Sequence, residues 1–196
     1  MKYLSDVEIK VIYFSKGGAV NTDKTLEIAR ERAKQLGIKD VIVASTHGGT
    51  ALKAARLFKD MKPNLVAVTI SGAFGKEGWL MTSEERKKLE AEGIKVLTCS
   101  HALGDGVAAS IAEKQGGISI EQIVTQTLYR FSQGMKVCVE IVLMAADAGL
   151  IGVDREVISI AGTGEGADTV IVVKPAYPRN FHEFEIRELL CKPRIS

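Results

Sequence analysis

Cysteine, proline and long apolar runs are all scarce in this chain of 196 residues. The three cysteines are an odd number, lie far apart and form no CxxC pair, which argues against a disulfide framework and a zinc site. Reduced thiols of this kind indicate a cytoplasmic protein, and the amino-terminal residues contain no apolar signal segment. The most apolar stretch, from Met135 to Ile151, is interrupted by three charged residues and is too short to span a bilayer.

An excess of charge of one sign is also absent. Lys and Arg total 26 against 24 Asp and Glu, which gives a formal net charge of +2. The basic residues alternate with acidic ones, so we expect no nucleic-acid or membrane partner. No linker rich in Pro, Ser or like charges divides the chain. We therefore expect a single α/β domain over residues 1–196, with its core at 22–174, an extra amino-terminal strand and a carboxyl-terminal tail.

Short β-branched runs alternate with helical patterns along the chain, which is typical of an α/β fold. Six runs predict strands, at residues 9–14, 40–44, 65–70, 94–98, 157–161 and 169–173. Helices are predicted at residues 22–36, after residue 50, near residue 108, and after capping boxes that begin at Thr82 and Ser119. The link between the last two strands is too short for a parallel crossover, so this pair should be antiparallel. The sequence thus predicts a three-layer α/β/α fold with a mostly parallel sheet and an antiparallel edge strand.

A further helix, predicted over residues 134–148, is apolar on most of its circumference. Lys136, Glu140 and Asp147 interrupt it, and at 100° per residue they fall on one narrow stripe. Such a helix is either buried against the sheet or half buried in a subunit interface. The pattern therefore leaves open a homo-oligomer that forms through this helix.

Ligands of open parallel sheets bind where the strands end, and five loops rich in Gly, Ser and Thr follow the predicted strands. The loop at residues 45–50 has two hydroxyls, then two glycines that let backbone amides approach a ligand, then the start of a helix. Such a turn binds phosphate through amides and the positive end of the helix dipole. The alternative is that Thr46 or Thr50 only caps the helix. The candidate ligand-binding residues are Ser45, Thr46, His47, Gly48, Gly49, Thr50, Ser15, Gly17, Ser71, Gly72, Gly104, Gly162 and Thr163.

Motifs for catalysis or metal binding find little support. The Gly72–Lys76 segment lacks the spacing of a Walker A loop, and the glycines at 162–166 precede a strand rather than a helix. The histidines have no HxH or HExxH spacing, so no metal site is expected. Cys99 and His101 could form a nucleophilic pair, although a buried and unreactive thiol is the commoner role. The sequence leaves open whether the protein catalyses a reaction.

Residues 43–56, followed by Lys62, Pro63 and the apolar run 65–69, resemble the C-terminal domain of pyruvate kinase. Later segments follow the order of that family, and the resemblance covers about residues 22–174. The 196 residues contain no catalytic barrel domain. The extra amino-terminal strand and the long segment 71–93 resemble the stand-alone, mainly archaeal proteins of the pyruvate kinase C-terminal-domain-like family.

This resemblance implies a ligand for the turn at residues 45–50. In full-length kinases the matching turn holds the phosphate of a sugar-phosphate effector, and the stand-alone relatives are associated with flavin mononucleotide (FMN). The resemblance therefore implies FMN, with its phosphate at residues 45–50 and its ring across the other glycine loops. The alternatives are a sugar-phosphate sensor or enzyme, and a structural protein in which the helix at 134–148 packs against a partner.

Overall fold

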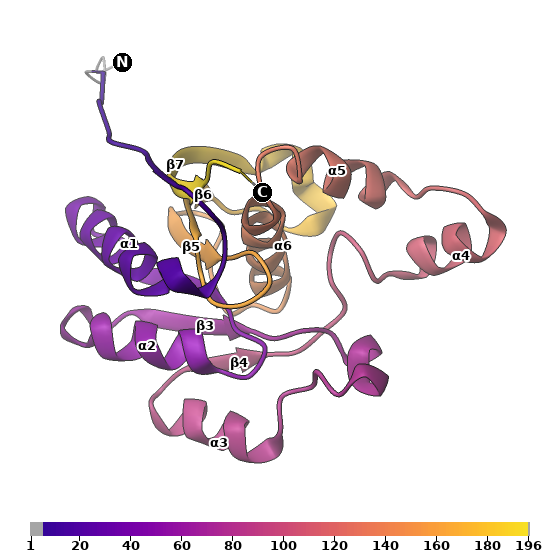
Figure 1. The fold of residues 1–196 in the computed structure, drawn as a ribbon, viewed down its shortest axis with the longest axis horizontal. Helices are drawn as coiled ribbons and strands as arrows, with labels where there is room; N and C mark the ends of the chain where they lie inside the picture. Colours follow the sequence, from indigo (N-terminus) through magenta and orange to yellow (C-terminus); the bar gives the residue numbers. More distant parts are fainter. Residues whose placement is uncertain (1–5, 196) are drawn as a thin grey trace.

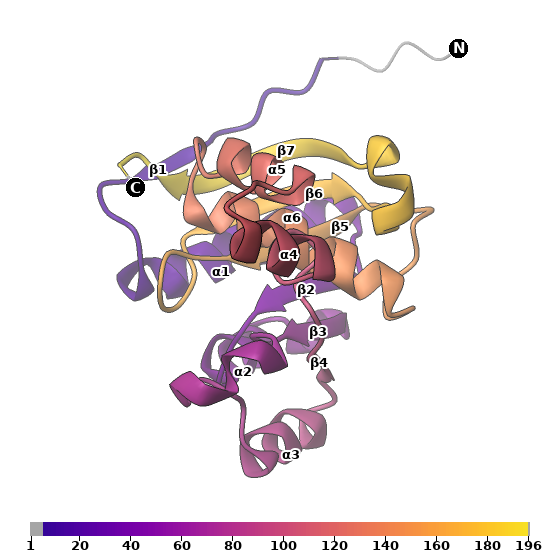
Figure 2. The same ribbon diagram turned by 90° about the vertical axis from the view of Figure 1, so that its right-hand side faces the viewer.

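The computed structural model describes residues 6–195, which form a seven-stranded sheet with helices on both faces (Figures 1 and 2). The strands are β1 (Ile12–Phe14), β2 (Asp40–Ala44), β3 (Asn64–Val68), β4 (Lys95–Leu97), β5 (Val157–Ala161), β6 (Thr169–Lys174) and β7 (Glu185–Pro193). Their order across the sheet is β1-β7-β6-β5-β2-β3-β4. The six predicted strands are confirmed, and β2 and β5 have the predicted bounds.

Parallel pairing dominates the half of the sheet that contains β2. This strand pairs in parallel with β3 and β5, and β3 pairs in parallel with β4. As the short link predicted, β6 is antiparallel to β5. Two strands lie beyond β6, because β7 pairs antiparallel with it and β1 pairs parallel with β7. The predicted mostly parallel α/β fold is confirmed, and its antiparallel strand lies inside the sheet rather than at the edge.

Helices cover both faces of the sheet (Figure 1). The α-helices of residues 6–195 are α1 (Thr22–Leu36), α2 (Gly49–Leu57), α3 (Ser83–Ala91), α4 (Val107–Gln115), α5 (Ile120–Leu128) and α6 (Gln133–Asp147). Short 3-10 helices are η1 (Ala19–Asn21), η2 (Lys59–Met61), η3 (Gly72–Glu77) and η4 (Pro178–Glu183). One hydrophobic core lies between the sheet and α1, α2 and α3, and the other lies between the sheet and α6, with α5 packed on α6. This arrangement is the predicted three-layer fold.

Several helices begin and end where local sequence signals placed them. α1 has its predicted bounds, because Gly37 adopts a left-handed φ of 69° and donates its amide to the last turn. The two predicted capping boxes are present, between Thr82 and Glu85 at α3 and between Ser119 and Gln122 at α5. These contacts satisfy amides that the first turn of a helix leaves without partners.

The apolar helix α6 is buried by its own chain. Twelve of its 15 residues are buried, between the sheet on one side and α5 on the other. The Lys136 ammonium lies 2.5 Å from the Glu140 carboxylate, so the two buried charges on the polar stripe compensate each other, while Asp147 is exposed. The apolar surface of this helix therefore needs no second subunit to cover it. Across residues 6–195, no helix has the length and apolarity needed to cross a membrane.

The residues expected to form a carboxyl-terminal tail contain the longest strand of the sheet, β7. Its two neighbours are β6 and β1, so the first and the last strand of the chain lie side by side (Figure 2). A two-pronged ion pair attaches α1 to this strand, since Arg32 donates to both carboxylate oxygens of Glu188 at 2.5 and 2.7 Å. The strand β7 is thus held in the sheet by contacts with residues distant in sequence, which local sequence patterns do not predict.

Gly134 allows the start of α6 to lie against the start of β6. A Cβ at this position would overlap the side chain of Thr169 and lie 3.0 Å from Asp168 Oδ1. We expect Gly134→Ala to lower the free energy of unfolding by about 1–3 kcal/mol, because its closely packed neighbours must move. Gly106→Ala is the matched control, since a Cβ there meets nothing within 4 Å. Urea denaturation measures both variants, and equal losses of stability would contradict the packing argument.

Candidate functional site

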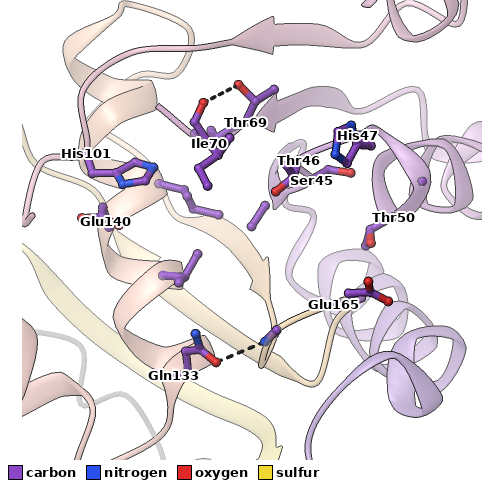
Figure 3. Close-up of a pocket in the computed structure, with 18 residues that line it drawn as sticks. Ser45, Thr46, His47, Thr50, Thr69, Ile70, His101, Gln133, Glu140 and Glu165 are labelled. Atoms are coloured by element: carbon purple, nitrogen blue, oxygen red, sulfur yellow. Dashed lines mark hydrogen bonds between the residues drawn. The ribbon is translucent and has the colours of Figure 1, made fainter. Parts of the chain in front are cut away.

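A pocket of about 490 Å³ opens at the edge of the sheet where β2, β3 and β5 end (Figure 3). Its walls come from the turn after β2, the end of β3, the first half of α6 and the loop between β5 and β6. Parallel strands end at the same edge, which explains why segments far apart in the sequence meet here. Six of the predicted ligand residues line the pocket, namely Ser45, Thr46, His47, Gly49, Thr50 and Gly162.

The turn at residues 45–50 presents a run of unpaired backbone amides at the start of α2. Gly48 precedes the helix in the left-handed region, with φ of 85°, and no side chain caps the helix. The Ser45 hydroxyl accepts a hydrogen bond from the Ala51 amide at 3.2 Å, one residue beyond that run. Within residues 6–195, the amides of residues 46–50 donate no hydrogen bond. Unpaired amides at a helix start form an anion-binding group, because their dipoles point at the same space.

The two glycines of this turn, Gly48 and Gly49, differ in their backbone conformation and in the space around them. A Cβ at Gly48 would overlap the side chain of Leu89 on α3, and the positive φ is strained for any other residue. A Cβ at Gly49 would meet nothing within 4 Å. Packing therefore explains Gly48, whereas Gly49 lines the pocket and has room for a side chain.

The remaining walls combine an apolar strip with a few polar groups. Val68 and Ile70 contribute from the end of β3, and Val137 and Ile141 contribute from α6. On the far side, Gln133 accepts a hydrogen bond from the Gly164 amide at 3.1 Å, which fixes the loop between β5 and β6 against α6 (Figure 3). An apolar strip with a small number of polar groups is typical of pockets that bind small organic molecules.

His101 lines the pocket in a defined orientation. Its Nδ1 lies 2.7 Å from the Asp105 carboxylate, and its Nε2 accepts a hydrogen bond from the Ser71 amide at 3.2 Å. The Ser71 amide thus holds one ring nitrogen, and the Asp105 carboxylate lies beside the other. The ring also lies against Phe74, with centroids 5.9 Å apart, and Phe74 stacks on Trp79 at 5.8 Å.

The nucleophilic pairing of Cys99 with His101 finds no support in this arrangement. Burial, followed by the charges of Asp147 and Glu140, raises the pKa of the Cys99 thiol, which therefore stays protonated. The His101 ring is engaged by Ser71 and Asp105 instead. Among the described residues, no three His, Cys, Asp or Glu side chains form a group that could hold a metal ion.

The other predicted ligand residues lie around the pocket without lining it. The buried carboxylate of Asp168 accepts hydrogen bonds from the amides of Gly18 at 2.8 Å and Thr163 at 3.0 Å, which joins the loop after β1 to the loop after β5. This contact places Gly17 beside Thr163, and neither Ser15 nor Gly17 lines the pocket. Ser71 and Gly72 lie beside His101, and Gly104 lies near the Lys136–Glu140 pair.

Sequence reasoning did not name the other pocket residues, which come from the strand ends, from α6 and from the loop between β5 and β6. They are Ala44, Val68, Thr69, Ile70, Gln133, Val137, Glu140, Ile141, Gly164, Glu165 and Gly166, and His101, considered above as a partner of Cys99, lines the pocket as well. One signal could have indicated Glu140. It is a charged residue on a helix that is otherwise apolar, and such a residue requires a local partner or a functional role.

The fold and the pocket define this protein as an open-sheet α/β protein with a pocket at the carboxyl ends of its parallel strands. The sequence model of the family described as pyruvate kinase, alpha/beta domain, matches residues 23–173. Because this match covers most of the chain, the protein belongs to that family. The resemblance inferred from the turn at residues 45–50 is thereby confirmed.

A search of solved structures finds a similarity to Cryptosporidium parvum pyruvate kinase in complex with ADP. The sequence identity is 15% and the TM-score is 0.39, with 78% of this chain and 24% of that chain covered. The chain therefore spans about a quarter of the length of that pyruvate kinase.

The buried Lys136–Glu140 ion pair beside the pocket can be tested for its contribution to the stability of the protein. We expect Lys136→Met to lower the free energy of unfolding by about 3–5 kcal/mol, because it leaves the Glu140 carboxylate buried without its cation. Glu140 also accepts a hydrogen bond from the Leu103 amide at 3.0 Å, and glutamine preserves that acceptor. The double variant Lys136→Met with Glu140→Gln should therefore regain most of the lost stability in urea denaturation. A double variant no more stable than Lys136→Met would contradict this account.

Proposed function

We propose that the pocket binds a phosphorylated small molecule, and that this molecule is FMN. The observation that carries the proposal is the run of unpaired amides at residues 46–50, at the start of α2 and beside the pocket. A phosphate there would accept hydrogen bonds from these amides and lie at the positive end of the helix dipole. The hydroxyls of Thr46 and Thr50 line the same space and would add further donors.

The rest of the pocket fits a flat aromatic ring with polar edges. The strip formed by Val68, Ile70, Val137 and Ile141 offers an apolar surface. Gln133 and Glu140 stand beside that strip and would bind polar atoms at the edge of the ring, while the His101 ring would add a packing surface. The volume of about 490 Å³ lies within the range of about 300–1,000 Å³ seen for small-molecule sites. FMN would supply electron or hydride transfer, while these residues would orient the ring and hold the phosphate.

The charge of the site is unusual for a phosphate pocket, because no Lys or Arg is among the residues that line it. Glu140 and Glu165 line it, and Glu140 is paired with Lys136. Stabilisation of a phosphate would therefore depend on amides, hydroxyls and the helix dipole. A substitution at the start of α2 therefore tests most directly whether the pocket binds a phosphate.

Gly49→Asp tests the phosphate site without unfolding the protein. An added side chain has room there, and an acidic residue in the first turn of a helix stabilises the helix. The carboxylate would occupy the amides and repel a phosphate. We expect FMN to bind at least about 30-fold more weakly, a loss of about 2 kcal/mol. Gly49→Ala, which fills the same space without charge, should change the affinity by about threefold at most.

Trp79, the only tryptophan in the chain, provides the measurement. It stacks on Phe74, which lies against His101 at the pocket, so energy transfer to a bound flavin should quench its fluorescence. Equal FMN affinity in Gly49→Asp and the wild type would refute the proposed phosphate site. Riboflavin, which lacks the phosphate, should bind more weakly than FMN to the wild type and equally well to both proteins.

Glu165 provides a second test of the phosphate charge. It lines the pocket and has no ion-pair partner within residues 6–195. We expect Glu165→Gln to strengthen FMN binding by about two- to fivefold, because it removes a like charge from an exposed position. Glu113→Gln on the exposed surface of α4 changes the net charge equally and should leave the affinity unchanged. Weaker binding by Glu165→Gln would indicate that this carboxylate accepts hydrogen bonds from the ligand.

A sugar phosphate is the second candidate ligand. The unpaired amides would bind its phosphate in the same way, and the polar groups of Thr69, Gln133 and Glu165 would accept hydrogen bonds from sugar hydroxyls. A colourless preparation that sugar phosphates stabilise against heating, and that does not retain FMN, would favour it.

The three cysteines are all free thiols, and on this ground we propose that the protein is cytoplasmic.

A further inference from the structure

A second hollow, of about 680 Å³, lies at the opposite edge of the sheet, where β2, β3 and β4 begin. Its residues come from the starts of these strands, from the segment between α6 and β5, and from Tyr177 after β6. Because β6 runs antiparallel to β5, its end reaches the same edge as the starts of the parallel strands. The hollow is therefore separated from the first pocket by the length of the strands.

The hollow gathers positive charge that the chain as a whole does not have. Lys39, Lys62, Lys95 and Arg155 line it, and Asp40 is the only acidic residue that does so. The formal charge of the lining is thus about +3, whereas the whole chain of 196 residues carries +2. A concave surface lined by one sign of charge attracts ions of the opposite sign more strongly than a flat one.

Asp40 holds part of this surface in place. Its buried carboxylate accepts hydrogen bonds from Arg155 Nε at 2.8 Å and from the Asn64 side-chain amide at 2.6 Å. The two terminal nitrogens of Arg155 have no hydrogen-bond partner within residues 6–195, so they are available to an anion. A guanidinium whose inner nitrogen is fixed presents its outer nitrogens in a defined orientation.

Two of the lysines that line the hollow, Lys62 and Lys95, are also available to bind an anion. Lys62 and Lys95 are exposed, and neither ammonium has an ion-pair or hydrogen-bond partner in the described part of the chain. Lys62 is the only non-glycine residue of that part with a positive φ, at 48°, and it precedes Pro63, which disfavours helical conformations in the residue before it. Lys62 therefore combines an uncommon backbone conformation with an unpaired ammonium group at the hollow. Residues in sparsely populated backbone conformations are often found at binding sites.

We propose that this hollow is a second, separate anion site, which binds a small molecule with two or more phosphate charges. The volume suits a metabolite-sized ligand. Lys62, Lys95 and Arg155 would bind its phosphates, and the Tyr177 hydroxyl would donate a further hydrogen bond. The two sites differ in chemistry, because the first offers amides and hydroxyls without a cation, whereas the second offers cations. The inference does not depend on the identity of the ligand in the first pocket.

Inorganic pyrophosphate is the probe, titrated by calorimetry at physiological salt. The titrations use the Gly49→Asp background, so that the turn at residues 45–50 does not compete for the probe. In this background we expect saturable binding, and the change Lys62→Gly with Lys95→Ala should weaken it about fivefold or more. Glycine relieves the positive φ at residue 62, so the urea midpoint should be unchanged or higher. A loss of binding therefore cannot be ascribed to unfolding.

A pair of surface lysines outside the hollow provides the control. Lys87→Ala with Lys114→Ala removes the same charge from α3 and α4, and should change the affinity for pyrophosphate by about twofold at most. An equal loss of affinity in the two double variants would overturn the proposal, because it would show attraction to net charge alone. The absence of saturable binding at about 10 mM pyrophosphate would also overturn it.

Discussion

The parallel pairing of β2 with β3 and β5 is the constraint on which the rest of the structure depends. Parallel strands need crossovers, and the crossovers place helices on both faces of the sheet. The parallel direction also brings all carboxyl ends of these strands to one edge of the sheet and all amino ends to the other. One edge carries the pocket with the unpaired amides, and the other carries the basic hollow. Both candidate sites are consequences of strand direction.

The first site shows how a phosphate can be accommodated without a cation. Backbone amides cannot be titrated and cannot swing away, so their contribution is fixed by the fold of the turn at residues 45–50. That turn is held by the left-handed Gly48, by the Ser45 hydroxyl and by the packing of Leu89. In the proposed function, the fold itself therefore supplies the positive potential, and the hydroxyls of Thr46 and Thr50 add neutral donors.

The parts of the fold that were predicted correctly are those governed by local rules. Gly37 ended α1 because few other residues adopt its backbone conformation, and the capping boxes of α3 and α5 satisfied amides within one turn. The strand β7 was not predicted, since Glu185, Arg187 and Glu188 obscure its apolar alternation. Its stability comes from β6, β1 and Arg32, which are distant in sequence.

The sequence by itself determined the strand and helix alternation, the family and the turn at residues 45–50, because each of these is encoded in neighbouring residues. Only the tertiary structure decided which loops share a pocket. It placed Glu140, Gln133 and Glu165 in the same pocket as that turn, and it placed Gly17 next to Asp168 instead. It also assembled the basic hollow from residues at the starts of three strands, from the segment between α6 and β5, and from Tyr177. Such groupings depend on strand order and direction, which a one-dimensional pattern of hydrophobic residues does not specify.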